Sequence, residues 1–215
     1  MPYLVPPHLP PGQLSASAQP VLTLADGVLL RPWRRTDAPA VVSAFADPAI
    51  QRWHMRRADS EAEAVGWIDE WRSAWAAETS AHWAIVSSGP DGTDGPDGTD
   101  GSDGTDGSDE VLGRMALRCV TPAVGRAECA YWILPAVRGR GLAPQAVRTV
   151  TRWAFEQAGF ERLELAHSVR NEASCRVAAT SGYPLEGTRR RGLRHADGWH
   201  DMHLHARVRD GGRTV

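Results

Sequence analysis

The segment YWILPAVRGRGLA at residues 131–143 constrains the fold of this chain more than any other. Its apolar first half predicts a strand, and Pro135 ends that strand because proline has no N–H to donate to a sheet. Gly139 and Gly141 then allow a tight turn, and a helix is expected over residues 142–158. A further strand, expected over residues 162–169, completes a strand–helix–strand crossover.

The beginning of that helix has the properties of an anion site. Its first N–H groups have no partner inside the helix, and the helix dipole adds about half a positive charge there. Arg138 and Arg140 add full charges. The turn therefore predicts a seat for a diphosphate. The same residues would also fit an ordinary turn with exposed arginines, because such short glycine motifs are weak evidence.

The rest of the chain predicts an α+β domain in α/β/α layers, with about seven strands, about four helices and a mostly antiparallel sheet. Residues 21–209 form this domain, and residues 1–20 and 210–215 are expected to be mobile tails. The hairpin between the strands at 82–86 and 111–120 contains an Asp/Gly-rich repeat over residues 89–110, which we expect to be a disordered insert. A calcium-binding repeat is disfavoured because no apolar residue recurs in it.

The insert also hides the charge of the remaining chain. It holds eight acids and no base, so the net charge rises from −2 to +6 when it is left out. A mildly basic domain suits an anionic ligand. The predicted helix that begins at Ser60 carries Trp67, Trp71 and Trp75 on one face. Those indoles fit either core packing or one wall of a pocket.

Several segments together resemble one known family. RGRGLA at 138–143 is similar to the R/Q-x-x-G-x-G/A motif of the GNAT N-acetyltransferase superfamily, and NEASCRVAATSGYPLEG at 171–187 resembles a second signature of that family. LRPWRRTDA at 30–38 and DGWHD at 197–201 resemble its first and last strands. The most similar branch is that of the ribosomal-protein N-terminal alanine or serine acetyltransferases. Tyr183-Pro184 and the Asp/Gly insert depart from the family pattern.

The resemblance implies an enzyme that moves an acetyl group from acetyl-CoA to a primary amine by direct attack. It implies a splayed sheet whose cleft binds the cofactor through Ile133, Leu134, Arg138, Gly139, Arg140, Gly141, Leu142, Ala143 and Asn171. By the same analogy Ser174 donates a proton at the sulfur, although serine is also common at helix starts. Glu128 is the candidate general base, acting through water, and a solvent-facing strand glutamate is an equal alternative. Glu164 and His167 are weaker candidates for the base.

No metal is expected. His203 and His205 share one strand face and His200 is near them, but no carboxylate or cysteine completes a ligand set in the sequence. Met202, Leu204, Ala206 and Val208 are expected to form the core face of that strand. The three cysteines, Cys119, Cys129 and Cys175, suggest reduced thiols.

The expected partner is an amine acceptor, either a protein N-terminus or a small molecule. We expect no nucleic acid and no membrane, a monomer or homodimer, and a cytoplasmic location. Two alternatives stay open at this point. One is a module that binds acyl-CoA without turnover, and the other is an interaction protein whose acidic loop recruits a basic partner.

Overall fold

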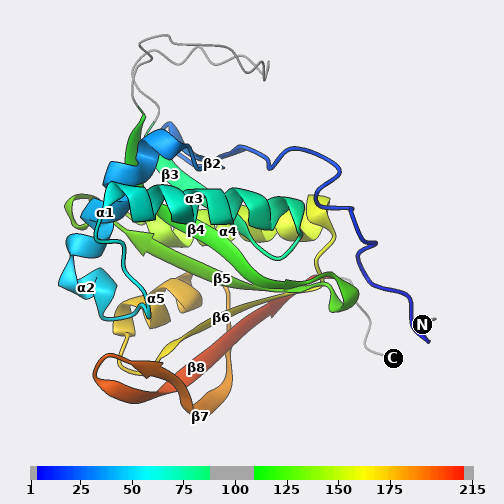
Figure 1. Cartoon of the computed structure of the whole chain (residues 1–215). Coiled ribbons are helices and arrows are strands. Elements are labelled where there is room, and N and C mark those ends of the chain that lie inside the picture. The colour runs from blue at the N-terminus through cyan, green and yellow to red at the C-terminus, as the bar shows by residue number, and fades with distance from the viewer. Residues whose placement is uncertain (1–3, 88–108, 211–215) are drawn as a thin grey trace, which may run out of the picture.

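The computed structural model describes residues 4–87 and 109–210, which build one eight-stranded sheet in the order β1-β2-β3-β4-β5-β6-β8-β7 (Figure 1). Neighbouring strands are antiparallel except for the parallel pair β5–β6. The strands are β1 (Leu22–Thr23), β2 (Val28–Pro32), β3 (Ala81–Ser87), β4 (Glu110–Thr121), β5 (Arg126–Ile133), β6 (Arg162–Ser168), β7 (Leu185–His195) and β8 (Gly198–Val208). The expected α+β class is confirmed, with eight strands where about seven were predicted.

Helices cover both faces of this sheet. They are α1 (Ala38–Ala46), α2 (Pro48–Gln51), α3 (Glu61–Ala76), α4 (Leu142–Trp153), which continues as a π-helical turn through Ala154–Ala158, and α5 (Glu172–Thr180). Alternate residues of β3 belong to different cores: Trp83 packs in the cluster with α4, and Ala84 in the cluster with α1 and α3. Because side chains alternate along a strand, these helices lie on opposite faces.

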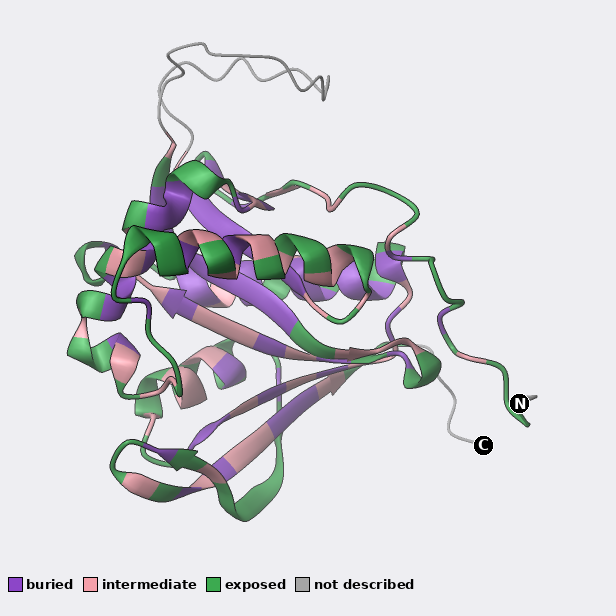
Figure 2. Cartoon of the chain, viewed as in Figure 1, coloured by how far each residue is buried: buried purple, intermediate pink, exposed green. Residues whose placement is uncertain are grey.

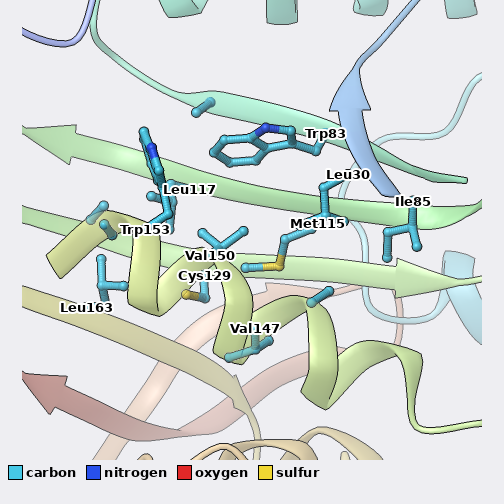
Figure 3. Packing of buried hydrophobic residues seen from close by; sticks show 14 of the residues in the cluster. Leu30, Trp83, Ile85, Met115, Leu117, Cys129, Val147, Val150, Trp153 and Leu163 are labelled. Atoms are coloured by element: carbon cyan, nitrogen blue, oxygen red, sulfur yellow. The ribbon is translucent and has the colours of Figure 1, made fainter. Parts of the chain in front are cut away.

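The core on the α4 side is the larger of the two. Figure 3 shows Val147, Val150 and Trp153 of α4 packed onto Met115 and other sheet residues. Figure 2 shows how the buried residues concentrate on the central strands, whereas most of β7 is exposed. None of the helices within the described ranges is long and apolar enough to cross a membrane.

The N-terminal segment departs from the expected mobile tail. From residue 4 onward it lies along the domain, and Leu9 and Leu14 are buried in the core at 2% and 7% exposure. Backbone N–H groups of His8 and Leu9 donate to carbonyls of residues 122–123. The carboxylate of Glu78 accepts from the amides of Gly12, Leu14 and Ser15 at 2.6–2.9 Å. The proline-rich composition of residues 1–20 gave no indication that these two leucines are buried.

The predicted insert at residues 89–110 is described only at its last two residues, Asp109 and Glu110. Residues 89–108 lie outside the described residues, as do 211–215 and 1–3. Asp109 is ordered, because its carboxylate accepts from the Nε of buried Arg31 at 3.0 Å. Glu110 is the first residue of β4. Arg31 also makes a two-point ion pair with Asp37, at 2.8 and 2.9 Å.

The last strand is covered on both faces, which corrects the predicted core face. Met202 and Ala206 are buried as expected, but Val208 is 53% exposed. His205, on the opposite face, is buried, and so is His200. On this opposite face, Cys175 of α5 lies beside His203 and His205, a contact that the alternation alone did not reveal.

Candidate functional site

The site begins where β5 and β6 part. Their parallel pairing runs from Arg126–Arg162 to Glu128–Glu164 and stops there, although β5 continues to Ile133 and β6 to Ser168. Figure 1 shows the two strands diverging toward the end where α5 lies. The splay leaves backbone groups on the facing edges of both strands without a strand partner, which is what an extended ligand needs to pair with.

A cavity of about 1210 Å³ occupies this fork and reaches both faces of the sheet. On the α4–α5 side it is lined by Tyr131, Asn171 and Ser174, and on the α3 side by Glu128 and Arg114. The two sets lie on different faces because odd and even residues of β5 point in opposite directions. One continuous cavity therefore connects the predicted cofactor side with a separate chamber under α3.

The turn before α4 presents unused backbone donors at the mouth of the cavity. Gly139 and Gly141 have φ of +79° and +74°, a left-handed conformation that glycine adopts at little cost. Within the described part of the chain, no hydrogen bond is formed by the amides of residues 139–143. Gly139, Arg140 and Gly141 are exposed, and both glycines line the cavity. This arrangement is suited to an anion.

The two arginines of the turn differ in their surroundings. Arg138 forms an ion pair with Asp47, and its Nε donates to the carbonyl of Ile133 at 3.1 Å. Arg140 makes no ion pair with any described residue. Of the two guanidinium groups of the turn, that of Arg140 is therefore exposed, and that of Arg138 is already bound to Asp47 and to the backbone of β5.

Ile133 and Leu134 also differ. The N–H of Leu134 donates to the carbonyl of Leu112 at 2.9 Å, so it is turned toward β4 and away from the fork. Because backbone groups alternate sides along a strand, those of Ile133 face the fork. Of the two residues predicted to pair with an extended ligand, only Ile133 has its backbone on the open edge.

The N-terminus of α5 contributes two polar side chains to the cavity, and β5 contributes a third. Asn171 caps the helix, since its Oδ1 accepts from the amide of Ser174 at 3.1 Å. Ser174 lines the cavity, and Tyr131 of β5 lies across from it. Burial raises the pKa of Tyr131, and a polar interaction with Ser174 partly offsets that rise. The Tyr131 hydroxyl makes no hydrogen bond of ordinary geometry to the described residues, so it is a buried O–H that the sequence analysis had overlooked.

The two carboxylates among the candidate bases lie on the other face of the fork, whereas His167 lies on the α5 side beside Cys175. Glu128 lines the cavity and pairs with Arg118 at 2.7 Å, with 23% of its side chain exposed. It is not the purely solvent-facing residue of the alternative interpretation. Glu164 is more buried, accepts from Arg162 at 2.9 Å, and does not line the cavity. Of the two carboxylates, only Glu128 can reach a ligand in the chamber.

A buried arginine forms the floor of the chamber under α3. Arg114 is 8% exposed, lines the cavity, and lies 4.6 Å from the ring centroid of Trp71. Its Nη2 donates to Nδ1 of His82 at 2.6 Å, and Nε2 of His82 meets Ser80 Oγ at 2.7 Å. Burial lowers the pKa of Arg114 to about 9, which leaves it charged at neutral pH. No carboxylate of the described residues pairs with it.

Two of the three tryptophans of α3 have both predicted roles, core packing and lining of a pocket. Trp67 and Trp71 pack with Phe45 and Trp33 in the α3-side core and also line the chamber. Trp75 instead packs toward Trp153 at 6.3 Å, on the other side of the sheet edge, and donates to the carbonyl of Ser17. The four-residue spacing placed all three on one face but could not show that the chamber ends before Trp75.

The histidines of β8 are joined by residues that the sequence analysis had not combined with them. His167 of β6 is the register partner of His203, and Cys175 of α5 lies beside His203 and His205. The fold therefore brings a cysteine to these histidines, which their spacing in the sequence did not show. A second network links Ser168 Oγ, His200 and Asp197 through contacts of 2.7 Å each. His200 is thus hydrogen-bonded within the protein.

Comparisons with known proteins agree with this architecture. The sequence model of the Acetyltransferase (GNAT) domain family matches residues 28–184. The uncharacterized N-acetyltransferase YoaA of Bacillus subtilis is 22% identical over 166 residues, which is 77% of this chain and 84% of YoaA. The ribosomal L7/L12 α-N-protein acetyltransferase RimL, solved in complex with coenzyme A, superposes with a TM-score of 0.74 at 16% identity over 89% of this chain and 99% of RimL.

A further solved structure is similar in fold. The microcin C7 self-immunity acetyltransferase MccE, in complex with acetyl-CoA and AMP, superposes with a TM-score of 0.70 at 15% identity. The superposition covers 85% of this chain and 93% of the MccE chain.

Proposed function

The chain belongs to the GNAT acetyltransferase family, and from this premise we propose that it transfers an acetyl group from acetyl-CoA to a primary amine in a ternary complex. The observation that carries the proposal is the fork between β5 and β6, with unused amides at residues 139–143 at its mouth. A diphosphate accepts hydrogen bonds from such amides, and an extended pantetheine arm pairs with an open strand edge.

The chain's own groups have distinct tasks in this proposal. Arg140 and the turn amides hold the diphosphate, and the backbone of Ile133 holds the arm. A backbone N–H on that edge polarises the thioester carbonyl, as in an oxyanion hole. The Asn171 side chain contacts the arm with its amide nitrogen, because its oxygen is used in capping α5.

Two proton transfers remain. Tyr131 and Ser174 lie on the same side of the fork, so a proton from this pair neutralises the departing thiolate. Tyr131 keeps its proton because burial raises its pKa. On the opposite face Glu128 removes a proton from the incoming ammonium group through water. The acceptor therefore enters from the α3 side and the thiolate leaves on the α5 side.

The chamber also indicates the class of acceptor. A buried guanidinium without a carboxylate partner is costly, and an anionic group of a ligand would compensate it. The face of Trp71 beside Arg114 offers an apolar surface next to that charge. We infer an amine that carries a carboxylate or phosphate, which a small molecule or a protein N-terminus with an acidic side chain can provide. MccE binds AMP, an anionic ligand, on the same fold.

The test combines binding with turnover. Calorimetry should detect CoA binding, and thiol release from acetyl-CoA should depend on an added amine. The amine panel pairs each anionic acceptor with a neutral analogue, such as an amino acid with its amide. Binding without release for any amine would favour the acyl-CoA-binding module. Absence of CoA binding would reject the proposal and leave the interaction protein, and fractionated cells would test the expected cytoplasmic location.

A further inference from the structure

We propose that His167, Cys175, His203 and His205 bind one zinc ion between helix α5 and the strands β6 and β8. One ligand atom from each of the four side chains lies within 4.8 Å of all the others. Such a separation needs only small side-chain rotations to reach a common ion at about 2.0–2.3 Å from each ligand.

The topology explains why these residues meet. His167 and His203 are direct partners across the antiparallel pair β6–β8, and His205 is two residues further along the same face. The ring centroids of His167 and His205 are 5.1 Å apart, and those of His167 and His203 are 5.4 Å apart. Cys175 lies on α5, which covers this face, and completes a set drawn from three elements.

The hydrogen bonds leave metal-binding lone pairs free. Nδ1 of His167 contacts the carbonyl of Ser168 at 2.8 Å, and Nδ1 of His205 contacts the carbonyl of Tyr183 at 3.0 Å. A carbonyl only accepts, so each Nδ1 carries the hydrogen and each Nε2 keeps its lone pair. This is the outer-shell arrangement that orients histidine ligands in metal sites.

The same lone pairs have no partner within the protein. Nε2 of His167, Nε2 of His205 and Nδ1 of His203 are buried and make no hydrogen bond to any described residue. A buried polar atom without a hydrogen-bond partner is destabilising, so three such atoms close to one another indicate a site for a ligand.

The donor set selects the ion. Three imidazole nitrogens and one thiolate suit zinc in tetrahedral geometry, whereas magnesium and calcium require oxygen ligands. Four protein ligands also describe a closed, structural site. Cys175 directly follows Ser174, so the ion would fix the first turn of α5 against the sheet. The metal is thereby inferred to position Ser174 and Asn171 at the fork.

The test uses the whole chain without a polyhistidine tag, stripped with a chelator and then titrated with zinc or cobalt(II). We expect elemental mass spectrometry to find one equivalent of zinc bound per chain. Cobalt(II) should give tetrahedral d–d bands and a thiolate-to-cobalt charge-transfer band. Zinc should also raise the melting temperature, as any ligand of the native state does.

Cys175→Ser should abolish the charge-transfer band and weaken zinc binding by more than the ~10–100-fold typical of an outer-shell change. Cys119→Ser, at an exposed cysteine, is the matched control and should bind as the wild type does. His203→Ala should also lose the site, with circular dichroism as the check on folding. A wild-type chain that binds no zinc and gives no cobalt spectrum would overturn the proposal, as would a Cys175→Ser variant with an unchanged spectrum.

Discussion

Glu128 of β5 and Glu164 of β6 are register partners in the last parallel pair before the two strands separate. Both carboxylates lie on the α3 face, and each is balanced by arginine: Glu128 by Arg118 and Glu164 by Arg162. The two strands therefore separate directly after a pair of glutamates whose charges are balanced by arginines. Of these two residues only Glu128 lines the cavity, which distinguishes the proposed base from a carboxylate that is held within the fold.

Glu128→Gln should lower kcat for amine acetylation by about 10²–10⁴-fold, the range for loss of a general base. The KM for acetyl-CoA should hardly change, because Glu128 lies on the face where the acceptor, not the cofactor, is proposed to bind. Glu164→Gln is the matched control, since Glu164 does not line the cavity. Steady-state kinetics with both substrates varied would measure this. Equal losses in both variants would assign Glu128 a structural role.

Gly141→Asp should abolish measurable CoA binding, because it places a carboxylate beside the amides that are proposed to hold the diphosphate. Gly141→Ala shares the backbone penalty of φ +74° without the charge, so it separates strain from repulsion. Calorimetry with CoA should give a much larger loss for the aspartate variant than for the alanine variant. Unchanged affinity in both would remove the diphosphate from this turn.

Much of this site could be predicted from sequence because it is local. The strand end at Pro135, the two glycines and the start of α4 are neighbours in the chain, so turn chemistry alone places them. The free amides depend on the same few residues. The sequence did not show that the backbone N–H of Leu134 points toward β4, because this depends on the register in which β5 pairs with β4.

Contacts between distant segments were beyond this reasoning. Arg114 and Trp71 come together only when α3 packs on β4, and no periodicity links them. Cys175 meets His203 and His205, which lie 28 and 30 residues further along the chain, through the packing of a helix onto a strand. Sequence patterns identify faces of elements, whereas these clusters depend on which faces meet.

Arg114→Gln should raise the KM for an anionic acceptor by about 10–100-fold, in line with the loss of a charge-assisted interaction of ~1.5–3 kcal/mol. The KM for the neutral analogue of the same amine should stay within about twofold. The comparison of the two acceptors in one variant controls for any general disturbance of the chamber. If both acceptors weaken equally, Arg114 holds the fold and does not recognise the anion.

His82 should make the stability of the protein depend on acid pH. Burial, followed by the positive charges of Arg114 and Arg118, lowers the pKa of His82 to about 2, against an ordinary value of 6.5. Between these values the unfolded chain binds a proton that the native protein does not, so stability falls as pH drops below 6.5. The contribution is about 1.4 kcal/mol per pH unit.

Urea unfolding measured at about pH 7.5, 6.5, 5.5 and 4.5 should reveal this dependence of the free energy of unfolding on pH. His82→Gln keeps an acceptor for Arg114 and a donor for Ser80 but has no proton to gain. The free-energy difference between the two proteins should be constant above pH ~6.5 and should narrow below it. Parallel curves throughout would mean that His82 takes up a proton as readily in the native state as in the unfolded chain, which contradicts the prediction.

The N-terminal segment provides the last prediction, because its anchoring leucine has a natural control nearby. Leu9 is 2% exposed and packs in the α4-side core, whereas Leu4 is fully exposed. Leu9→Ala should destabilise the protein by about 2–5 kcal/mol, the cost of deleting a buried leucine side chain, and Leu4→Ala should have no measurable effect. Chemical denaturation measures both effects. The comparison is valid if neither substitution changes the slope of the free energy of unfolding against denaturant concentration. If Leu9→Ala is as stable as the wild type, residues 4–20 form the mobile tail that their composition suggests, and the contacts of Glu78 with this segment do not persist in solution.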